Sequence, residues 1–168
     1  MSGSRSGSSS KKPSATASKR RPRFGNEGAD VEGVSLPEKF GGLAKAQETI
    51  LQTLLARSLS HESKGYPDRL SDTLNKVIER GDSAGMDEYM RARRLTAECR
   101  GESAGLFQGH HVLLAPSVKG EAPEGLETTG DPLFCQMWTL LGLPCVSAPG
   151  IWGPNGLPLG AQIIGPMY

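Results

Sequence analysis

Thiols, imidazoles and hydroxyls are the side chains of this 168-residue sequence that could act as nucleophiles or bases. The thiols are Cys99, Cys135 and Cys145, and the adjacent histidines His110 and His111 could serve one of them as a base. No motif surrounds these residues, so a Cys–His nucleophile is not predicted. A metal site is not predicted either, because adjacent histidines on a strand point to opposite faces and no further ligands follow at usable spacing.

The Gly- and Ser-rich run at residues 2–10 is the only segment with the composition of a flexible serine loop. It precedes any suitable lysine instead of following one, and no strand or helix pattern flanks it. Residues 1–24 contain seven Lys or Arg and no Asp or Glu. Such a segment buries too little apolar surface to offset chain entropy, so residues 1–27 are predicted to form a disordered basic tail.

The charge of the remaining chain is acidic. Positions 25–168 carry 12 basic and 18 acidic side chains, a net charge of −6, although the whole chain is near neutral. The cluster of Arg91, Arg93 and Arg94 is therefore interpreted as the solvated face of a helix, and no nucleic-acid partner is predicted. No apolar run is long enough for a membrane helix. Three scattered cysteines without a C-x-x-C pair indicate reduced thiols and a cytoplasmic location.

Three helices are predicted before residue 110. An apolar stripe at helical spacing marks Leu43 to Leu59 as the first. The second runs from about Leu70 and is expected to stop at Gly81. The third is expected to begin at Asp87, which is an acceptable N-cap residue.

The predicted strands lie mostly in the second half of the chain. Ala29 to Pro37 is an early candidate, and the continuous apolar run from His111 to Pro116 is typical of a strand buried on both faces. After a loop at 117–130, we expect a short buried helix at Asp131 to Leu141, and then strands at Cys145–Ala148 and Leu159–Ile164. The Asn-Gly pair within residues 153–156 favours a tight turn with positive φ between the last two strands. Strands separated by helices predict an α/β fold in which helices cover a mixed sheet.

Five sequence blocks follow one another in a recognisable order. They are Val-Ser-Leu-Pro (34–37), Asp-Glu-Tyr-Met-Arg-Ala-Arg-Arg (87–94), Val-Leu-Leu-Ala-Pro-Ser (112–117), Leu-Gly-Leu-Pro (141–144) and Asn-Gly-Leu-Pro-Leu-Gly-Ala-Gln-Ile-Ile-Gly-Pro (155–166). Together they closely resemble the C-terminal part of the amidase signature family, serine amide hydrolases with a Ser-Ser-Lys triad. The resemblance covers roughly residues 28–168.

The resemblance implies a fold and a missing part. In the family, the nucleophilic serine lies in a Gly/Ser-rich loop well upstream of this region, and the lysine lies further upstream still. Residues 28–168 are therefore expected to be a partial amidase domain that lacks the catalytic half and the final helix. No catalytic residue is assigned in this chain, and the resemblance implies neither a metal nor an organic cofactor.

In the intact family fold, this region helps to wall the acyl pocket. The resemblance therefore makes Asp131, Phe134 and Trp138 candidate substrate-binding residues, since pockets are lined mainly by apolar and aromatic groups. Each also has a structural alternative. Phe134 and Trp138 could belong to the core, and Asp131, which precedes Pro132, could cap the following helix.

Three functional hypotheses follow. The first is a fragment of a hydrolase whose intact parent cleaves a small-molecule carboxamide and which is inactive alone. The second is a non-catalytic interaction module, or one half of a split amidase whose partner is a separate N-terminal half. The third is a basic tail that binds nucleic acid or an anionic surface. Because one side of the core is expected to be missing, the chain is also predicted to be aggregation-prone or loosely ordered.

Overall fold

The structure is a computed structural model that describes residues 28–167, so the predicted tail at residues 1–27 lies outside the described residues. The chain divides into two units, residues 1–34 and residues 35–168. The described part of the first unit contains no helix or strand. The prediction of a strand at Ala29–Pro37 is therefore wrong. An isolated apolar run forms no strand without a neighbour to accept its backbone hydrogen bonds.

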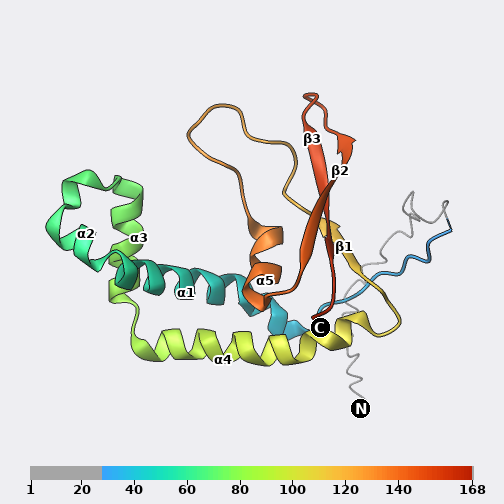
Figure 1. The fold of residues 1–168 in the computed structure, drawn as a ribbon, viewed down its shortest axis with the longest axis horizontal. Helices are drawn as coiled ribbons and strands as arrows, with labels where there is room; N and C mark the ends of the chain where they lie inside the picture. Colours follow the sequence, from blue (N-terminus) through green and yellow to red (C-terminus); the bar gives the residue numbers. More distant parts are fainter. Residues whose placement is uncertain (1–27, 168) are drawn as a thin grey trace, which may run out of the picture. The chain divides into compact units, whose positions relative to one another are not determined.

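Long helices form one layer of the second unit (Figure 1). Its first helix, α1, follows a short 3-10 helix and confirms the prediction for residues 43–59. The helical elements up to residue 107 are η2 (Glu38–Gly42), α1 (Leu43–Ser58), α2 (Ser60–Gly65), η3 (Pro67–Arg69), α3 (Asp72–Ser83), α4 (Met86–Glu102) and η4 (Ser103–Phe107). The predicted second and third helices correspond to α3 and α4, whereas α2 and the 3-10 helices η2, η3 and η4 were not predicted.

Two predicted helix boundaries need correction. Gly81 lies inside α3 and does not end it, because it sits where α3 packs against α1. A Cβ atom at Gly81 would lie 2.0 Å from the carbonyl oxygen of Gln52, so only glycine allows this approach. The N-cap of α4 is Gly85, and Asp87 lies in the first turn, where its negative charge still favours the helix dipole.

The sheet has three strands in the order β1-β3-β2: β1 (Leu113–Pro116), β3 (Pro158–Ile164) and β2 (Cys145–Trp152). Both pairings are antiparallel, so the α/β fold is confirmed but the described strands do not form the expected mixed sheet. The short turn between β2 and β3 permits only antiparallel pairing, because parallel neighbours need a long crossover. β2 also extends four residues beyond the predicted Ala148.

The β2–β3 turn follows the prediction in part. The amide of Gly156 donates to the Gly153 carbonyl at 3.1 Å, and the amide of Gly153 donates to the Leu157 carbonyl at 2.8 Å. Gly156 has a φ of 78°, but Asn155 does not have a positive φ. The turn therefore needs the left-handed conformation at the glycine alone, as in hairpin loops that end in a left-handed residue.

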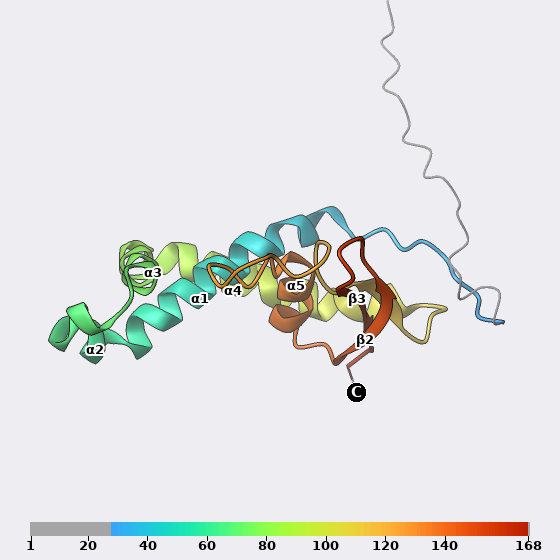
Figure 2. The same ribbon diagram turned by 90° about the horizontal axis from the view of Figure 1, so that it is seen from above.

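Helix α5 (Leu133–Leu141) stands between the sheet and the long helices (Figure 2). It begins two residues after the predicted start, and only Trp138 and Leu141 are fully buried. One face of the sheet contributes Leu113 and Ile164 to the core formed around it. The buried core consists of Phe40, Leu43, Cys99, Leu106, Leu113, Trp138, Leu141, Leu143 and Ile164.

Arg100 ties α4 to α5. Its Nε donates to the Leu141 carbonyl at 2.8 Å, and its Nη2 donates to the Leu140 carbonyl at 3.0 Å. These carbonyls lie in the last turn of α5, where the helix leaves acceptors without intrahelical partners. The guanidinium satisfies them and places a positive charge at the negative end of the helix dipole.

The outer face of the sheet is apolar and uncovered in the described part of the chain. We define it by two cross-strand rows that the pairing register places on the face opposite Leu113 and Ile164. The rows are Leu114, Ile163 and Val146, and then Pro116, Ala161 and Ala148. Leu114 is 47% exposed and Val146 is 66% exposed. The run from His111 to Pro116, which contains β1, was predicted to be buried on both faces. That prediction is wrong for the described residues, because only one helical layer covers the sheet.

Candidate functional site

Asp131 lies just before α5 and joins two structural features. Its Oδ1 accepts a hydrogen bond from the Leu133 amide at 2.9 Å, and its Oδ2 lies 2.5 Å from Nζ of Lys119. The carboxylate therefore satisfies one of the free amides at the start of the helix. The Lys119 ammonium, and secondarily the Leu133 amide, hold the pKa of Asp131 below its usual value because both stabilise the charged form.

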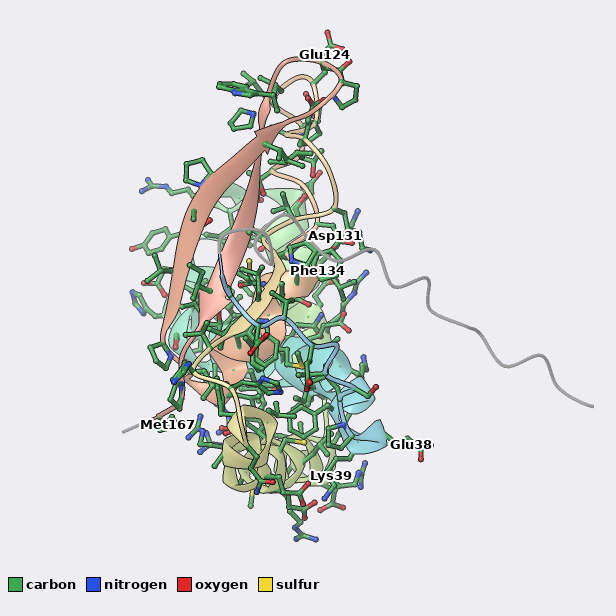
Figure 3. The ribbon with its side chains drawn as sticks, turned by 90° about the vertical axis from the view of Figure 1, so that its right-hand side faces the viewer. Glu38, Lys39, Glu124, Asp131, Phe134 and Met167 are labelled. Carbon is green, nitrogen blue, oxygen red and sulfur yellow. The ribbon has the colours of Figure 1, made fainter. Side chains whose placement is uncertain are left out.

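Phe134 is the second residue of α5 (Figure 3) and is half-buried. Its carbonyl accepts a hydrogen bond from Nε2 of Gln162 at 2.7 Å, and the same Nε2 donates to the Pro116 carbonyl at 2.9 Å. Gln162 is only 4% exposed, so its amide is a buried polar group with its bonds made. The backbone of Phe134 thus fixes α5 to two strands of the sheet.

Trp138 lies four residues beyond Phe134, on the same side of α5, since residues four apart share a helix face. It is 5% exposed and packs in the core with Leu43 and Ile164. Within residues 28–167 its ring is a core side chain. The structure thus brings the three candidates together along α5 but places them at different depths, with the charged one outermost.

A pair of hydroxyls near this site was not predicted. Oγ of Ser117 and Oγ of Ser147 lie 3.1 Å apart, and Sγ of Cys135 donates to the Ser117 carbonyl at 3.1 Å. The two serines are 30 positions apart, so no local motif could have linked them; only the register between β1, β3 and β2 brings them together. Lys119 is close in sequence, but its ammonium is paired with Asp131. Within the described residues, neither hydroxyl contacts the base that a serine nucleophile needs.

Two of the thiols, Cys99 and Cys145, are not activated. Burial raises the pKa of Cys145, and the neighbouring Cys135 adds to this effect. Burial likewise raises the pKa of Cys99, which is fully enclosed in the core. Because the thiolate is the reactive form, these shifts disfavour Cys99 and Cys145 as nucleophiles.

Residues 28–167 do not provide two other kinds of site. There, no cluster of three or more His, Cys, Asp or Glu side chains is placed to hold a metal ion. No helix in this range has the length and apolar character required to cross a membrane. A polar cleft of about 330 Å³ lies away from the candidate site. Its lining residues come from α1, from α3 and the residue after it, and from α4: Lys45, Glu48, Thr49, Gln52, Arg80, Ser83, Ala84 and Glu88.

Known proteins resemble this chain in sequence. No protein-family model matches it. A glutamyl-tRNA(Gln) amidotransferase subunit from Granulibacter bethesdensis is 27% identical over 168 aligned residues, which cover 82% of this chain and 34% of that protein. The chain spans only 13% to 34% of the length of such curated relatives.

Solved structures have the same fold over a similar share of their length. The crystal structure of an amidase superposes with a TM-score of 0.74 and 22% identity, and the match covers 85% of this chain and 35% of that one. A bacterial aryl acylamidase described as an amidase signature enzyme superposes with a TM-score of 0.55 and 22% identity, over 78% of this chain and 31% of that one. The chain is therefore a relative of the amidase signature proteins over part of their length, and the resemblance found in its sequence is confirmed.

Proposed function

We propose that residues 28–168 are part of a hydrolase that, when complete, cleaves a small-molecule carboxamide through a serine acyl-enzyme. The observation that carries this proposal is the match to the Granulibacter amidotransferase protein over 82% of the chain. The superposition on an amidase supports the same fold. By resemblance, the family's Ser-Ser-Lys triad belongs to the part of the fold that this segment does not span.

We further propose that this chain has no amidase activity alone. Serine hydrolysis requires an activated hydroxyl, a base within hydrogen-bond reach and an oxyanion hole. The Ser117–Ser147 pair offers two hydroxyls without a base, because Lys119 is engaged by Asp131. Without nucleophile and base, only weak binding contributions to the rate remain.

The proposed contribution of this segment to the complete enzyme is one wall of the substrate pocket. Asp131 supports this role because its charged group is exposed and held in place by Lys119. Phe134 is half-buried beside it, and Trp138 would support both from the core. The three cysteines are free thiols, which supports the proposed cytoplasmic location.

The apolar outer face of the sheet supports a second candidate function, that of an interaction module. A strand whose two faces are both apolar is typical of a sheet covered on both sides. We propose that the missing layer is supplied by the catalytic part of the amidase fold. It would be either continuous with this chain or encoded separately as an N-terminal half.

The test is an assay of ammonia release from a simple carboxamide by the purified 168-residue chain. The expected result is no release above that of an S117A/S147A control prepared in the same way. Release that is lost in the control variant would overturn the proposal of inactivity. In parallel, the full transcript and its genomic neighbourhood should be sequenced. A lysine and a Gly/Ser-rich loop, in frame or in an adjacent gene, are expected, and their absence from both would contradict the proposed hydrolase.

A further inference from the structure

Glu121 lies in the loop at 117–130, and its carboxylate reaches the turn of the β2–β3 hairpin. Oε1 and Oε2 accept from the backbone amide of Asn155 at 3.0 and 3.1 Å. Oε2 also accepts from Nδ2 of Asn155 at 2.7 Å, and Oε1 accepts from the Leu157 amide at 3.1 Å. One carboxylate therefore satisfies three N–H donors of a turn, and hydrogen bonds to a charged acceptor are stronger than neutral ones.

The hairpin makes room for this carboxylate at Gly153. A Cβ atom there would lie 2.2 Å from Oε1 of Glu121, inside the distance that real Cβ atoms keep. Gly153 does not have a positive φ, so its backbone does not require glycine. The close approach of Glu121 is what excludes a side chain, which makes the pair a matched contact between loop and hairpin.

Further hydrogen bonds hold the two ends of the 117–130 loop, and an ion pair joins them. At its start, the Ser117 amide donates to the Gly160 carbonyl at 3.0 Å, which continues the β1–β3 pairing by one residue. Near its end, Asp131 is bonded to α5 through Leu133. Lys119 crosses between these ends, because its ammonium pairs with Asp131. Glu121 is two residues beyond Lys119, so its attachment fixes the backbone that carries the lysine.

We infer that Glu121 is a positioning residue that fastens the 117–130 loop to the hairpin turn and thereby holds Lys119 against Asp131. The inference concerns the geometry of this pair and stands whether or not the complete protein hydrolyses amides. Glu124 offers a matched control, because it has the same side chain in the same loop, is exposed and lies at the hairpin end of the domain (Figure 3).

The experiment compares the full chain with Glu121→Ala, Gly153→Ala and Glu124→Ala. Gly153→Ala keeps the carboxylate but pushes it out, so it tests the contact if Glu121→Ala does not fold. The first measurement is the rate of protease cleavage within residues 122–130. We expect Glu121→Ala and Gly153→Ala to raise it by about tenfold, as loss of hydrogen bonds to a charged group predicts.

The second measurement is the pKa of Asp131, followed by NMR, and a merely structural contact would not change it. The Asp131 carboxylate faces the Lys119 ammonium and the Leu133 amide. In Glu121→Ala and Gly153→Ala, the pKa of Asp131 should rise toward the ordinary value because Lys119 is no longer held beside it. Glu121→Gln keeps an acceptor oxygen and should give an intermediate pKa of Asp131. Glu124→Ala should change neither quantity. Faster cleavage with an unchanged pKa, or no difference from Glu124→Ala, would overturn the inference.

Discussion

Asp131 performs a structural role that the sequence indicated and an electrostatic one that it did not. The position of an Asp before Pro132 favoured a helix cap; the N-cap residue of α5 is Pro132 itself, and Asp131, one position earlier, accepts a hydrogen bond from the Leu133 amide at the start of the helix. The ion pair with Lys119 joins residues 12 positions apart across a loop. No periodicity or motif spans such a loop, so the pairing could not have been predicted. The substrate roles of Asp131, Phe134 and Trp138 remain predictions.

The lowered pKa of Asp131 makes part of the stability dependent on pH. Because the folded pKa is below the unfolded value of about 3.9, the stabilisation is complete above that value and disappears as pH falls through the folded pKa. Asp131→Asn keeps an oxygen for the Leu133 amide but removes the charge facing Lys119. We expect a small loss of stability that is constant between about pH 7 and about pH 5 and vanishes at lower pH.

Denaturant midpoints measured across this pH range test the prediction. Asp68→Asn is the control, because Asp68 lies on the exposed η3 and its carboxylate makes no ion pair within residues 28–167. A difference between the wild-type chain and Asp131→Asn that stays constant to the lowest pH would show that the Lys119 pair does not stabilise the fold.

At the scale of elements, α1, α4, α5 and the hairpin were predictable because each has a strong local signal. Apolar residues at helical spacing and the Asn-Gly turn both depend on neighbours within a few positions. The failures have a different cause. Gly81 was interpreted as a helix stop, whereas its role depends on the backbone of α1, about 30 positions away. The strand expected at 29–37 failed because the sequence cannot show whether a partner strand is available.

The α1–α3 contact predicts opposite outcomes for two helical glycines. Gly81→Ala would place Cβ against the Gln52 carbonyl and 2.9 Å from Cβ of Ala56, so α1 and α3 would have to separate. We expect it to lower the free energy of unfolding by about 2 kcal/mol, typical of overpacking. Gly101→Ala in α4 meets nothing within 4 Å and should be neutral or stabilising, by up to about 1 kcal/mol.

Urea unfolding followed by circular dichroism distinguishes the two effects. Intrinsic helix propensity alone would make both substitutions stabilising. Because a Cβ at Gly101 meets no neighbour, Gly101→Ala measures the helix-propensity contribution without a packing clash. If Gly81→Ala were as stable as Gly101→Ala, the two helices would not pack as closely as described.

At the scale of the whole molecule, the described part resembles one side of a layered α/β domain. The inner face of the sheet has its helical cover, and the outer face has apolar side chains without one. The sequence predicted the uncovered side through the family resemblance but placed no residues on it. That assignment required the antiparallel register, since a shift of one residue would exchange the two faces.

The outer face predicts self-association of the isolated chain. Val146 is 66% exposed and lies in this face on β2, an edge strand of the sheet, so Val146→Asp should weaken association with little cost in folding. Burial of one valine is worth about 1.5 kcal/mol, which corresponds to roughly a tenfold weaker dissociation constant. Leu126→Asp is the control, because Leu126 is fully exposed in the loop and lies outside the outer face.

Sedimentation velocity over a concentration series measures this effect. A chain that stays monomeric with a cooperative unfolding transition would contradict the expected aggregation, as would equal weakening by Leu126→Asp. Addition of the complementary amidase part should reduce the association of the wild-type chain, because both would compete for the same face.

The bonds from Arg100 to the end of α5 have a consequence for how the domain loses its structure. One guanidinium belongs to the helical layer, while its two acceptors belong to the helix that lies against the sheet. Separation of α5 from α4 would leave that charge and two carbonyls without hydrogen-bond partners, which costs free energy. The two layers are therefore expected to unfold together. The amide hydrogens of α4 and of α5 should therefore exchange in one shared opening event, even though 40 positions separate the residues that couple them.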